Sequence, residues 1–313
     1  MQIGMIGLGK MGQNMARRLL KGRHKVVAYD RSPEKVEETA AFGAKGASSL
    51  EEFAGLLAPP RVVWIMVPAG KPVDDTIQAL KGLLKKGDTI IDGGNSHYKD
   101  DQRRESELKS SGINYMDAGV SGGVWGLKEG YCLMVGGDRK TFRLLEPIFK
   151  TLAPPEGYLH CGKVSAGHFV KMVHNGIEYG MMQAYGEGFA LINASEYGEG
   201  LDFSKLAHLW NRGSVIRSWL LELAEDAFKK DRDLSLIEGY VEDSGEGRWT
   251  VEAAIETGVP MPVIASSLFQ RFGSRGLSSF SDRLLAALRQ EFGGHAVKKK
   301  ASAVKRGKGE RSR

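Results

Sequence analysis

The chain has 313 residues, of which 42% are hydrophobic and 26% are charged, and its formal net charge is +6. This length suits two ordinary domains, and the composition is typical of a globular protein. No apolar run approaches the roughly 18 residues of a membrane-spanning helix, and the first apolar run starts at Met1 without the features of a signal peptide. We therefore expect a cytoplasmic protein with no membrane partner.

The cysteines and the C-terminal tail argue against two further classes of protein. Cys132 and Cys161 have no metal-ligand spacing and are too few for a disulfide framework, so we expect no metal site. Residues 296–313 hold eight Lys or Arg and one Glu, a net charge of +7, which leaves −1 for residues 1–295. A basic tail without apolar periodicity is typical of a disordered end, so we expect no specific nucleic-acid partner.

In residues 1–162, short apolar runs alternate with amphipathic stretches. Strands are predicted at residues 3–7, 25–29, 61–67, 89–91, 113–116 and 132–135. Helices are predicted at residues 10–21, 33–41, 72–85, 97–111 and 138–150. This order predicts an α/β domain with a doubly wound, largely parallel sheet.

From residue 165 onward the strand pattern disappears and only helical periodicity remains. Helices are predicted at residues 165–195, 202–228, 249–257, 260–272 and 278–292. A Pro-Pro break at residues 154–155 and the short run at 158–161 end the first domain. We expect an all-helical domain at residues 163–295, which serves substrate binding and oligomerisation, and a basic disordered tail at residues 296–313.

A glycine-rich turn follows the first predicted strand directly. Gly7, Gly9 and Gly12 form a G-x-G-x-x-G pattern that opens a helix. The first glycine allows the tight turn, the second lets the backbone approach a pyrophosphate, and the third lets helix and strand pack closely. This context predicts a Rossmann-type dinucleotide-binding domain. The expected contacts here and in the neighbouring loops are Gly7, Leu8, Gly9, Lys10, Met11, Gly12, Val67 and Asn95.

The second predicted strand ends at Asp30, about 20 residues after the glycine-rich turn. An acid at this position accepts hydrogen bonds from a ribose 2′-hydroxyl and repels a 2′-phosphate, which favours NAD over NADP. The neighbouring Arg31 leaves NADP open as an alternative, because its guanidinium could stack on adenine or meet a 2′-phosphate.

One predicted helix carries four polar side chains on a single face. Lys171, His174, Asn175 and Glu178 stand at i, i+3, i+4 and i+7 among apolar neighbours. Such a stripe either forms a buried internal network or lines a polar cleft. A lysine whose pKa is lowered by burial can act as a base near neutral pH, and a carboxylic acid two turns away can return a proton.

The segment around this stripe, GHFVKMVHNGIEYG at residues 167–180, closely resembles the catalytic segment of 6-phosphogluconate dehydrogenases. Three further stretches agree with that family: DGGNS at residues 92–96, VSGG at 120–123 and RWT at 248–250. The resemblance covers about residues 1–295. It is greatest to the family's shorter branch, whose helical domain lacks a second copy of the long helices.

The resemblance implies a reaction and a site. Lys171 would take the proton of the substrate's C3 hydroxyl during hydride transfer, and Glu178 would protonate C1 of the enediol that remains after carbon dioxide leaves, giving ribulose 5-phosphate. Contacts with the substrate's carboxylate and hydroxyls are implied for Asn95, Ser121, Gly122, Gly123, His174 and Asn175. The implied role is in the pentose phosphate pathway and gluconate utilisation.

The phosphate-binding part of the sequence departs from the longer members of the family. Residues 243–250, DSGEGRWT, lack the family's Lys-Gly-Thr segment, so those contacts do not transfer. The remaining candidates are Tyr179, Arg271 and Arg289–His295, which resembles the family's Arg-x-x-Phe-Gly-x-His. In relatives this last segment reaches a neighbouring subunit, which implies a homodimer or homotetramer. A surface position is the alternative reading for both arginines.

Two other functions stay open from the sequence. A β-hydroxyacid dehydrogenase for a smaller acid would share the fold, the Ser-Gly-Gly loop and the catalytic lysine, but it would not need Glu178 or the arginines. A nucleotide-sensing protein without turnover would not need Lys171 and Glu178. The expected function is therefore the oxidative decarboxylation of 6-phosphogluconate with NAD.

Overall fold

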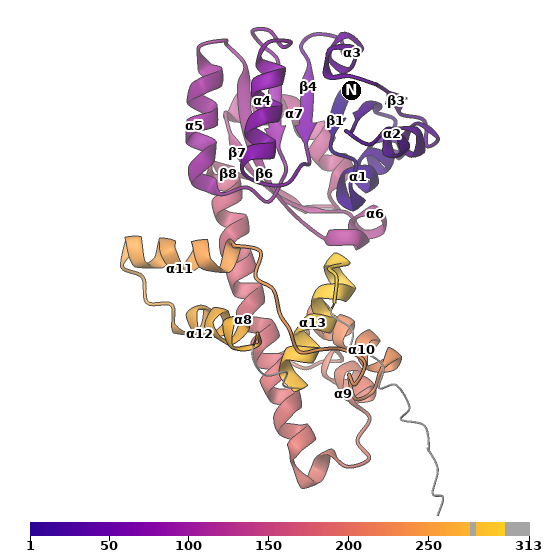
Figure 1. The fold of residues 1–313 in the computed structure, drawn as a ribbon, viewed down its shortest axis with the longest axis vertical. Coiled ribbons are helices and arrows are strands. Elements are labelled where there is room, and N and C mark those ends of the chain that lie inside the picture. Colours follow the sequence, from indigo (N-terminus) through magenta and orange to yellow (C-terminus); the bar gives the residue numbers. More distant parts are fainter. Residues whose placement is uncertain (276–279, 298–313) are drawn as a thin grey trace, which may run out of the picture. The chain divides into compact units, whose positions relative to one another are not determined.

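A computed structural model describes residues 1–275 and 280–297, and Figure 1 shows its elements. The chain forms two compact units. Unit 1 consists of Met1–Tyr179 and Ser244–Ala265, and unit 2 of Gly180–Asp243 and Ser266–Arg313. The long helix α8, Ala166–Ala194, contributes to both units. The domain limits expected at residues 162 and 295 stay predictions, and the basic tail from residue 298 lies outside the described residues.

Unit 1 contains one sheet with the strand order β3-β2-β1-β4-β5-β6-β7-β8. All neighbouring strands are parallel except β6 and β7. The strands are β1 Gln2–Ile6, β2 Lys25–Tyr29, β3 Lys45–Gly46, β4 Val62–Ile65, β5 Thr89–Asp92, β6 Asn114–Ser121, β7 Cys132–Gly137 and β8 Tyr158–Gly162. The predicted doubly wound, largely parallel sheet is confirmed. Only β3 gave no sequence signal, because its two residues are too few for an apolar run.

Helices cover both faces of this sheet (Figure 1). They are α1 Lys10–Lys21, α2 Pro33–Ala40, α3 Leu50–Gly55, α4 Lys71–Lys81, α5 Tyr98–Lys109, α6 Gly126–Glu129 and α7 Arg139–Leu152. Strand residues alternate between two cores: Ile3 and Trp64 pack with residues of α1 and α7, whereas Ile65 packs with residues of α3 and α4. The sequence did not indicate α3 and α6, which are among the shortest helices.

The later helices are α9 Phe203–Trp210, α10 Trp219–Lys230, α11 Glu246–Thr257, α12 Pro262–Gly273 and α13 Phe280–Gly293. The single helix predicted over residues 202–228 is wrong, because α9 ends at Trp210 and α10 begins at Trp219. Ser218 accepts a hydrogen bond from the Leu221 N–H and thereby starts the second helix. Within the described residues, no helix is both long and apolar enough to span a membrane.

Unit 2 is held together by an aromatic core. The ring of Phe189 in α8 lies 5.7 Å from that of Phe203 in α9 and 4.9 Å from that of Phe228 in α10. Phe280 of α13 lies 6.0 Å from Phe203. Tilted and edge-on aromatic pairs at these distances add stabilisation beyond the apolar area that they bury. The second half of α8 is therefore fixed among the helices of its own unit.

Candidate active site

The glycine-rich turn has the geometry that a dinucleotide requires. Gly7 has a φ of +90°, and a Cβ atom there would lie 2.4 Å from the Met66 carbonyl oxygen. A Cβ atom at Gly12 would lie 2.0 Å from the Gly7 carbonyl oxygen, so only glycine lets α1 pack this closely. Gly9, in contrast, faces open space. The first and third glycines thus shape the turn, and the second leaves room for a pyrophosphate at the start of α1.

Asp30 ties the end of β2 to this turn. One carboxylate oxygen accepts a hydrogen bond from the Leu8 N–H at 2.6 Å, and the other accepts one from the Ser32 N–H at 2.9 Å. Each oxygen keeps a lone pair that can take a ribose hydroxyl. Arg31 is exposed beside it, as is Lys10, while Leu8 is buried and Met11 packs against the core. The residues at this edge of the sheet therefore fit a nicotinamide dinucleotide, NAD or NADP.

The loops after β4 and β5 come close to the same edge. A Cβ atom at Gly7 would lie 3.1 Å from Val67, and one at Gly94 would lie 3.0 Å from the Val67 carbonyl oxygen. Asn95 is exposed at the tip of the β5 loop. The structure thus brings the loops of the predicted cofactor residues together.

The four polar residues of α8 form one connected group with β6. Lys171 Nζ donates a hydrogen bond to Asn175 Oδ1, and His174 Nδ1 lies 3.1 Å from the same oxygen. His174 Nε2 lies 3.4 Å from Ser121 Oγ, and its Nδ1 lies 3.9 Å from Glu178 Oε2. Gly122 and Gly123 follow Ser121 with φ angles of +133° and +50°, which favour glycine. Sequence spacing therefore predicted a real cluster of side chains.

The environment of Lys171 favours its neutral form. Desolvation lowers the pKa of Lys171, and the carboxylates of Glu178 and Glu246 partly oppose this by raising it. Desolvation also lowers the pKa of His174, and the Lys171 charge lowers it further. A lysine with a lowered pKa beside a carboxylic acid is equipped for general acid–base chemistry.

Glu246 is a member of this group that the sequence did not single out. It is 3% exposed in the first turn of α11, and among the described residues its Oε2 has no hydrogen-bond partner. Thr250 Oγ1 donates to the Met172 carbonyl oxygen at 2.9 Å, which attaches α11 to α8. A Cβ atom at Gly176 would lie 2.8 Å from Thr250 Cγ2, so glycine is needed for this approach. The one sequence signal for Glu246 is its position four residues before Thr250, which places both side chains on the same face of the helix.

The predicted phosphate ligands are divided between the two units. Tyr179 belongs to unit 1, is 4% exposed and packs against Gly247. Arg271, Arg289 and His295 belong to unit 2. Arg271 is 1% exposed and donates to the Glu242 carbonyl oxygen at 3.0 Å, and Arg289 is 8% exposed. The reading of these two as surface arginines is therefore wrong, whereas their contact with a substrate stays a prediction.

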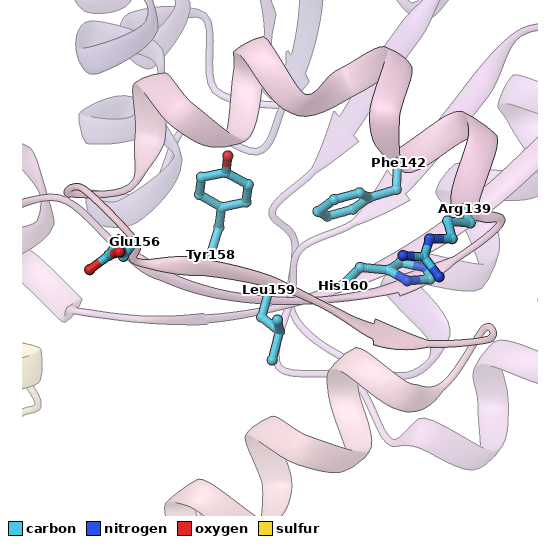
Figure 2. A pocket seen from close by; sticks show the side chains of 6 residues that line it. All are labelled: Arg139, Phe142, Glu156, Tyr158, Leu159 and His160. Carbon is cyan, nitrogen blue, oxygen red and sulfur yellow. The ribbon is translucent and has the colours of Figure 1, made fainter.

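A separate hollow lies between α7 and β8, and Figure 2 shows the side chains that line it. Its lining residues are Arg139, Phe142, Glu156, Tyr158, Leu159 and His160. None of them is a predicted site residue. The Tyr158 hydroxyl donates to Glu146 at 2.8 Å, and His160 Nε2 pairs with the Gly137 carbonyl oxygen at 2.9 Å. These two polar atoms therefore already have partners within the protein.

Two family models together match almost the whole chain. Residues 2–167 match the NAD binding domain of 6-phosphogluconate dehydrogenase, and residues 167–306 match the 6-phosphogluconate dehydrogenase C-terminal domain. A 6-phosphogluconate dehydrogenase of Haloferax volcanii, named as NAD(+)-dependent and decarboxylating, is 45% identical over 302 residues, which cover 96% of this chain and 99% of that one. The Bacillus subtilis protein YqeC, which carries the family name only provisionally, is 50% identical over 96% of this chain and 100% of its own.

Solved structures show the same fold. The 6-phosphogluconate dehydrogenase of Plasmodium falciparum superimposes with a TM-score of 0.79 at 33% identity, covering 88% of this chain and 62% of that chain. The 3-hydroxyisobutyrate dehydrogenase of Salmonella typhimurium superimposes with a TM-score of 0.73 at 23% identity, covering 90% of this chain and 98% of its own. The second likeness concerns the fold alone.

Proposed function

Since the chain belongs to the 6-phosphogluconate dehydrogenase family, we propose that it oxidises and decarboxylates 6-phosphogluconate to ribulose 5-phosphate and carbon dioxide. The observation that carries this proposal is the group of Lys171 and Glu178 on one face of α8, with the pKa of Lys171 lowered by desolvation. An oxidation at C3 needs a base, and a decarboxylation that ends in an enediol needs an acid.

Lys171 and Glu178 divide the proton transfers between them. Lys171 Nζ accepts the proton of the C3 hydroxyl, and as an ammonium group it then donates a hydrogen bond to the new C3 carbonyl. That carbonyl takes up the electron pair when the C1 carboxylate leaves as carbon dioxide. Glu178 donates a proton to the substrate's C2, which is C1 of the enediol and becomes C1 of ribulose 5-phosphate. A bound nicotinamide supplies the acceptor for the hydride from C3.

We propose NAD as the cofactor, with NADP as the alternative. The support is Asp30, whose carboxylate lies at the end of β2 and is held by the Leu8 and Ser32 N–H groups. A fixed negative charge there favours a ribose hydroxyl over a 2′-phosphate. The Haloferax volcanii relative is named as NAD(+)-dependent, while the Plasmodium falciparum structure is described with NADP+.

The remaining substrate contacts are also proposals. Asn95, Ser121, Gly122, Gly123, His174 and Asn175 would hold the carboxylate and hydroxyls. Tyr179, Arg271, Arg289 and His295 would hold the phosphate, the last two from a neighbouring subunit of a homodimer or homotetramer. A pentose phosphate pathway enzyme of this kind would work in the cytoplasm.

Glu246 favours a second candidate function. A buried carboxylate beside Lys171 would repel a substrate phosphate that approached the start of α11, in the segment where longer family members have Lys-Gly-Thr. A smaller β-hydroxyacid without phosphate would not meet this repulsion. The two functions therefore predict opposite preferences between 6-phosphogluconate and unphosphorylated acids.

The test measures NADH or NADPH formation and released carbon dioxide with 6-phosphogluconate, gluconate and 3-hydroxyisobutyrate. We expect turnover and carbon dioxide with 6-phosphogluconate only. Lys171→Met should abolish oxidation while NAD still binds, and Glu178→Gln should lower overall turnover by about 10²- to 10⁴-fold. Turnover of the smaller acid without that of 6-phosphogluconate would replace the proposed function by the second one.

A further inference from the structure

Four charged side chains lie fully buried behind the candidate active site in unit 1. Asp92, Asp101 and Arg104 are 0% exposed, and His168 is 2% exposed. Arg104 Nη1 lies 3.0 Å from Asp92 Oδ2 and 3.9 Å from Asp101 Oδ1, and His168 Nδ1 lies 2.8 Å from Asp101 Oδ2. We call this chain of residues, from Asp92 through Arg104 and Asp101 to His168, the buried ionic network.

One end of the buried ionic network holds the loop after β5, which faces the cofactor edge. Asp92 accepts hydrogen bonds from the Gly94 N–H at 3.0 Å and from Ser96 Oγ at 2.7 Å, on both sides of Asn95. Arg104 Nε donates to Asp74 of α4 at 2.8 Å. The loop that carries Asn95 is therefore fastened to α4 and α5 through a single guanidinium group.

The other end holds the start of the helix that carries Lys171. His168 stands one turn before Lys171 in α8. The Tyr115 hydroxyl of β6 donates to Asp101 at 2.9 Å and so fixes the carboxylate that His168 contacts. Asp117, also of β6, accepts hydrogen bonds from the Ser165 and His168 N–H groups, both at 2.8 Å. These contacts set both the position and the rotation of the first turn of α8.

The charges of this group balance within the protein. Asp92, Asp101 and His168 each place one ligand atom within 4.8 Å of the others, as in a metal site. The guanidinium of Arg104 already supplies positive charge to both aspartates. Burial alone would lower the pKa of His168, but Asp101, Asp92 and Asp117 raise it to about 10, so His168 is also cationic near neutral pH. The two positive charges thus pair with the two aspartates, while His168 Nε2 is buried without a hydrogen-bond partner among the described residues.

We propose that Asp101, Arg104 and His168 are positioning residues for the reaction, which hold the Asn95 loop and the Lys171 turn of α8 in one fixed geometry. None of the three belongs to the predicted site. Apolar residues of similar volume would stabilise the core as well as these charged residues do, because burying charges is costly even when they are paired. What paired, directional contacts add is a single arrangement of the segments that they join.

The size of the expected effect follows from how strongly catalysis depends on geometry. A displacement of about 1 Å at a reacting group can lower the rate by about 10²-fold. Loss of the His168 contact frees the turn that ends in Lys171, so the rate of the chemical step should fall. The described contacts of His168 are with Asp101 and Asp117, away from the Gly7–Gly12 turn and the Asn95 loop, so NAD affinity should not change in a His168 variant.

The inference rests on the proposed function, and the experiment separates the two. His168→Leu removes the contact with Asp101, whereas His168→Asn keeps a donor near the Nδ1 position. Arg104→Lys keeps the charge but loses the planar fork. The matched control is Arg103→Lys, because Arg103 is the preceding residue, also pairs with Asp74 at 3.0 Å, and has a side chain that is 46% exposed instead of 1%.

We expect His168→Leu and Arg104→Lys to lower kcat by about 10- to 100-fold, with an unchanged Kd for NAD in His168→Leu, and His168→Asn to recover a large part of the loss. Arg103→Lys should stay within about twofold of the wild type. Each kcat is measured well below the variant's Tm. A kcat in His168→Leu and Arg104→Lys equal to that of the control would overturn the proposal.

A second readout does not need the substrate. The pH dependence of Lys171 modification by trinitrobenzenesulfonate, followed by mass spectrometry, gives the apparent pKa of this amine in the free protein. We expect that pKa to rise toward its ordinary value in His168→Leu; no change contradicts the proposal. If the wild type does not turn over 6-phosphogluconate, the proposed function fails while this readout still tests positioning.

If His168→Leu and Arg104→Lys do not fold, Tyr115→Phe is the variant that tests the proposal. This change deletes only the hydroxyl that holds Asp101 and leaves all charges of the network in place. We expect kcat to fall by about three- to tenfold with NAD binding intact. A folded Tyr115→Phe protein with wild-type kcat and a wild-type apparent pKa of Lys171 would contradict the proposal.

Discussion

The backbone of Gly119 in β6 supports Lys171 of α8 so closely that a Cβ atom at Gly119 would lie 2.3 Å from Lys171 Cβ. The same Cβ atom would lie 2.9 Å from the Gly167 carbonyl oxygen. The sheet therefore fixes how far Lys171 stands from β6, and a side chain as small as a methyl group cannot be accommodated without moving α8.

Gly119→Ala should consequently damage activity more than stability. We expect a loss of about 1 to 3 kcal/mol in unfolding free energy from overpacking, and a fall in kcat of about 10²-fold because Lys171 is displaced. Gly188→Ala is the control, since Gly188 lies in α8 like Lys171 and a Cβ atom there meets open space. Equal kcat values for the two variants would refute the link between β6 and Lys171.

Glu246→Gln should change the pH dependence of the reaction. Desolvation lowers the pKa of Lys171 and the Glu246 carboxylate raises it, so loss of that charge should lower the pKa of Lys171 further. The neutral lysine is the base, so the acidic limb of the kcat/KM profile should move to lower pH. Glu252→Gln, an exposed change in the same helix, should leave the profile in place. A limb that moves to higher pH would contradict this account.

Asp30→Asn and Asp30→Ser should both shift preference from NAD toward NADP, because both remove the charge that repels a 2′-phosphate. Asparagine can keep one of the two backbone hydrogen bonds through its single amide oxygen, whereas serine is too short to reach either donor in the same way. We expect the serine variant to lose more stability than the asparagine variant, with a loss of about 1 to 3 kcal/mol for each hydrogen bond. The ratio of kcat/KM for the two cofactors and chemical denaturation measure the two effects. A wild type that already prefers NADP would show that Asp30 does not select NAD.

His168 should make folding stability depend on pH in the alkaline range. The neighbouring aspartates raise the pKa of His168 from about 6.5 to about 10, so the native state holds a proton that the unfolded state releases. The resulting stabilisation is fully present below pH of about 6.5 and is lost as the pH rises to about 10. Urea denaturation should show a fall of roughly 4 to 5 kcal/mol over this range in the wild type, relative to His168→Asn. Parallel curves for the two proteins would show that His168 is neutral in the native state.

Arg289→Ala should weaken use of 6-phosphogluconate without affecting NAD. A lost charged hydrogen bond costs about 1.5 to 3 kcal/mol, which corresponds to a KM about 10- to 100-fold higher. Mixing inactive Lys171→Met subunits with Arg289→Ala subunits tests whether the arginine acts across an interface. Recovered activity in the mixture would support that arrangement. No recovery despite demonstrated subunit exchange would mean that each chain completes its own site.

The sequence alone determined what depends on local spacing. The positions of Gly7, Gly9 and Gly12 directly after an apolar run specify a glycine-rich turn, and the structure has that turn, with Gly7 and Gly12 sterically required. The i, i+3, i+4, i+7 spacing from Lys171 to Glu178 places those side chains on one face of any helix. Alternating apolar runs and amphipathic helices are sufficient for a doubly wound sheet, because each element can bury its apolar face in only a few ways.

Only the tertiary structure decided which distant residues meet. Glu246 lies beside Lys171 because Thr250 and Gly176 let α11 pack on α8, and no local pattern encodes a contact between segments so far apart in the chain. Arg104 and Arg103 are identical residues at adjacent positions, yet one is fully buried and the other exposed, because the turn of α5 points only one of them at Asp92. Burial is a property of the packed chain and not of its local sequence. The pKa of a group and the strength of its electrostatic interactions depend on burial, so they are also decided by packing.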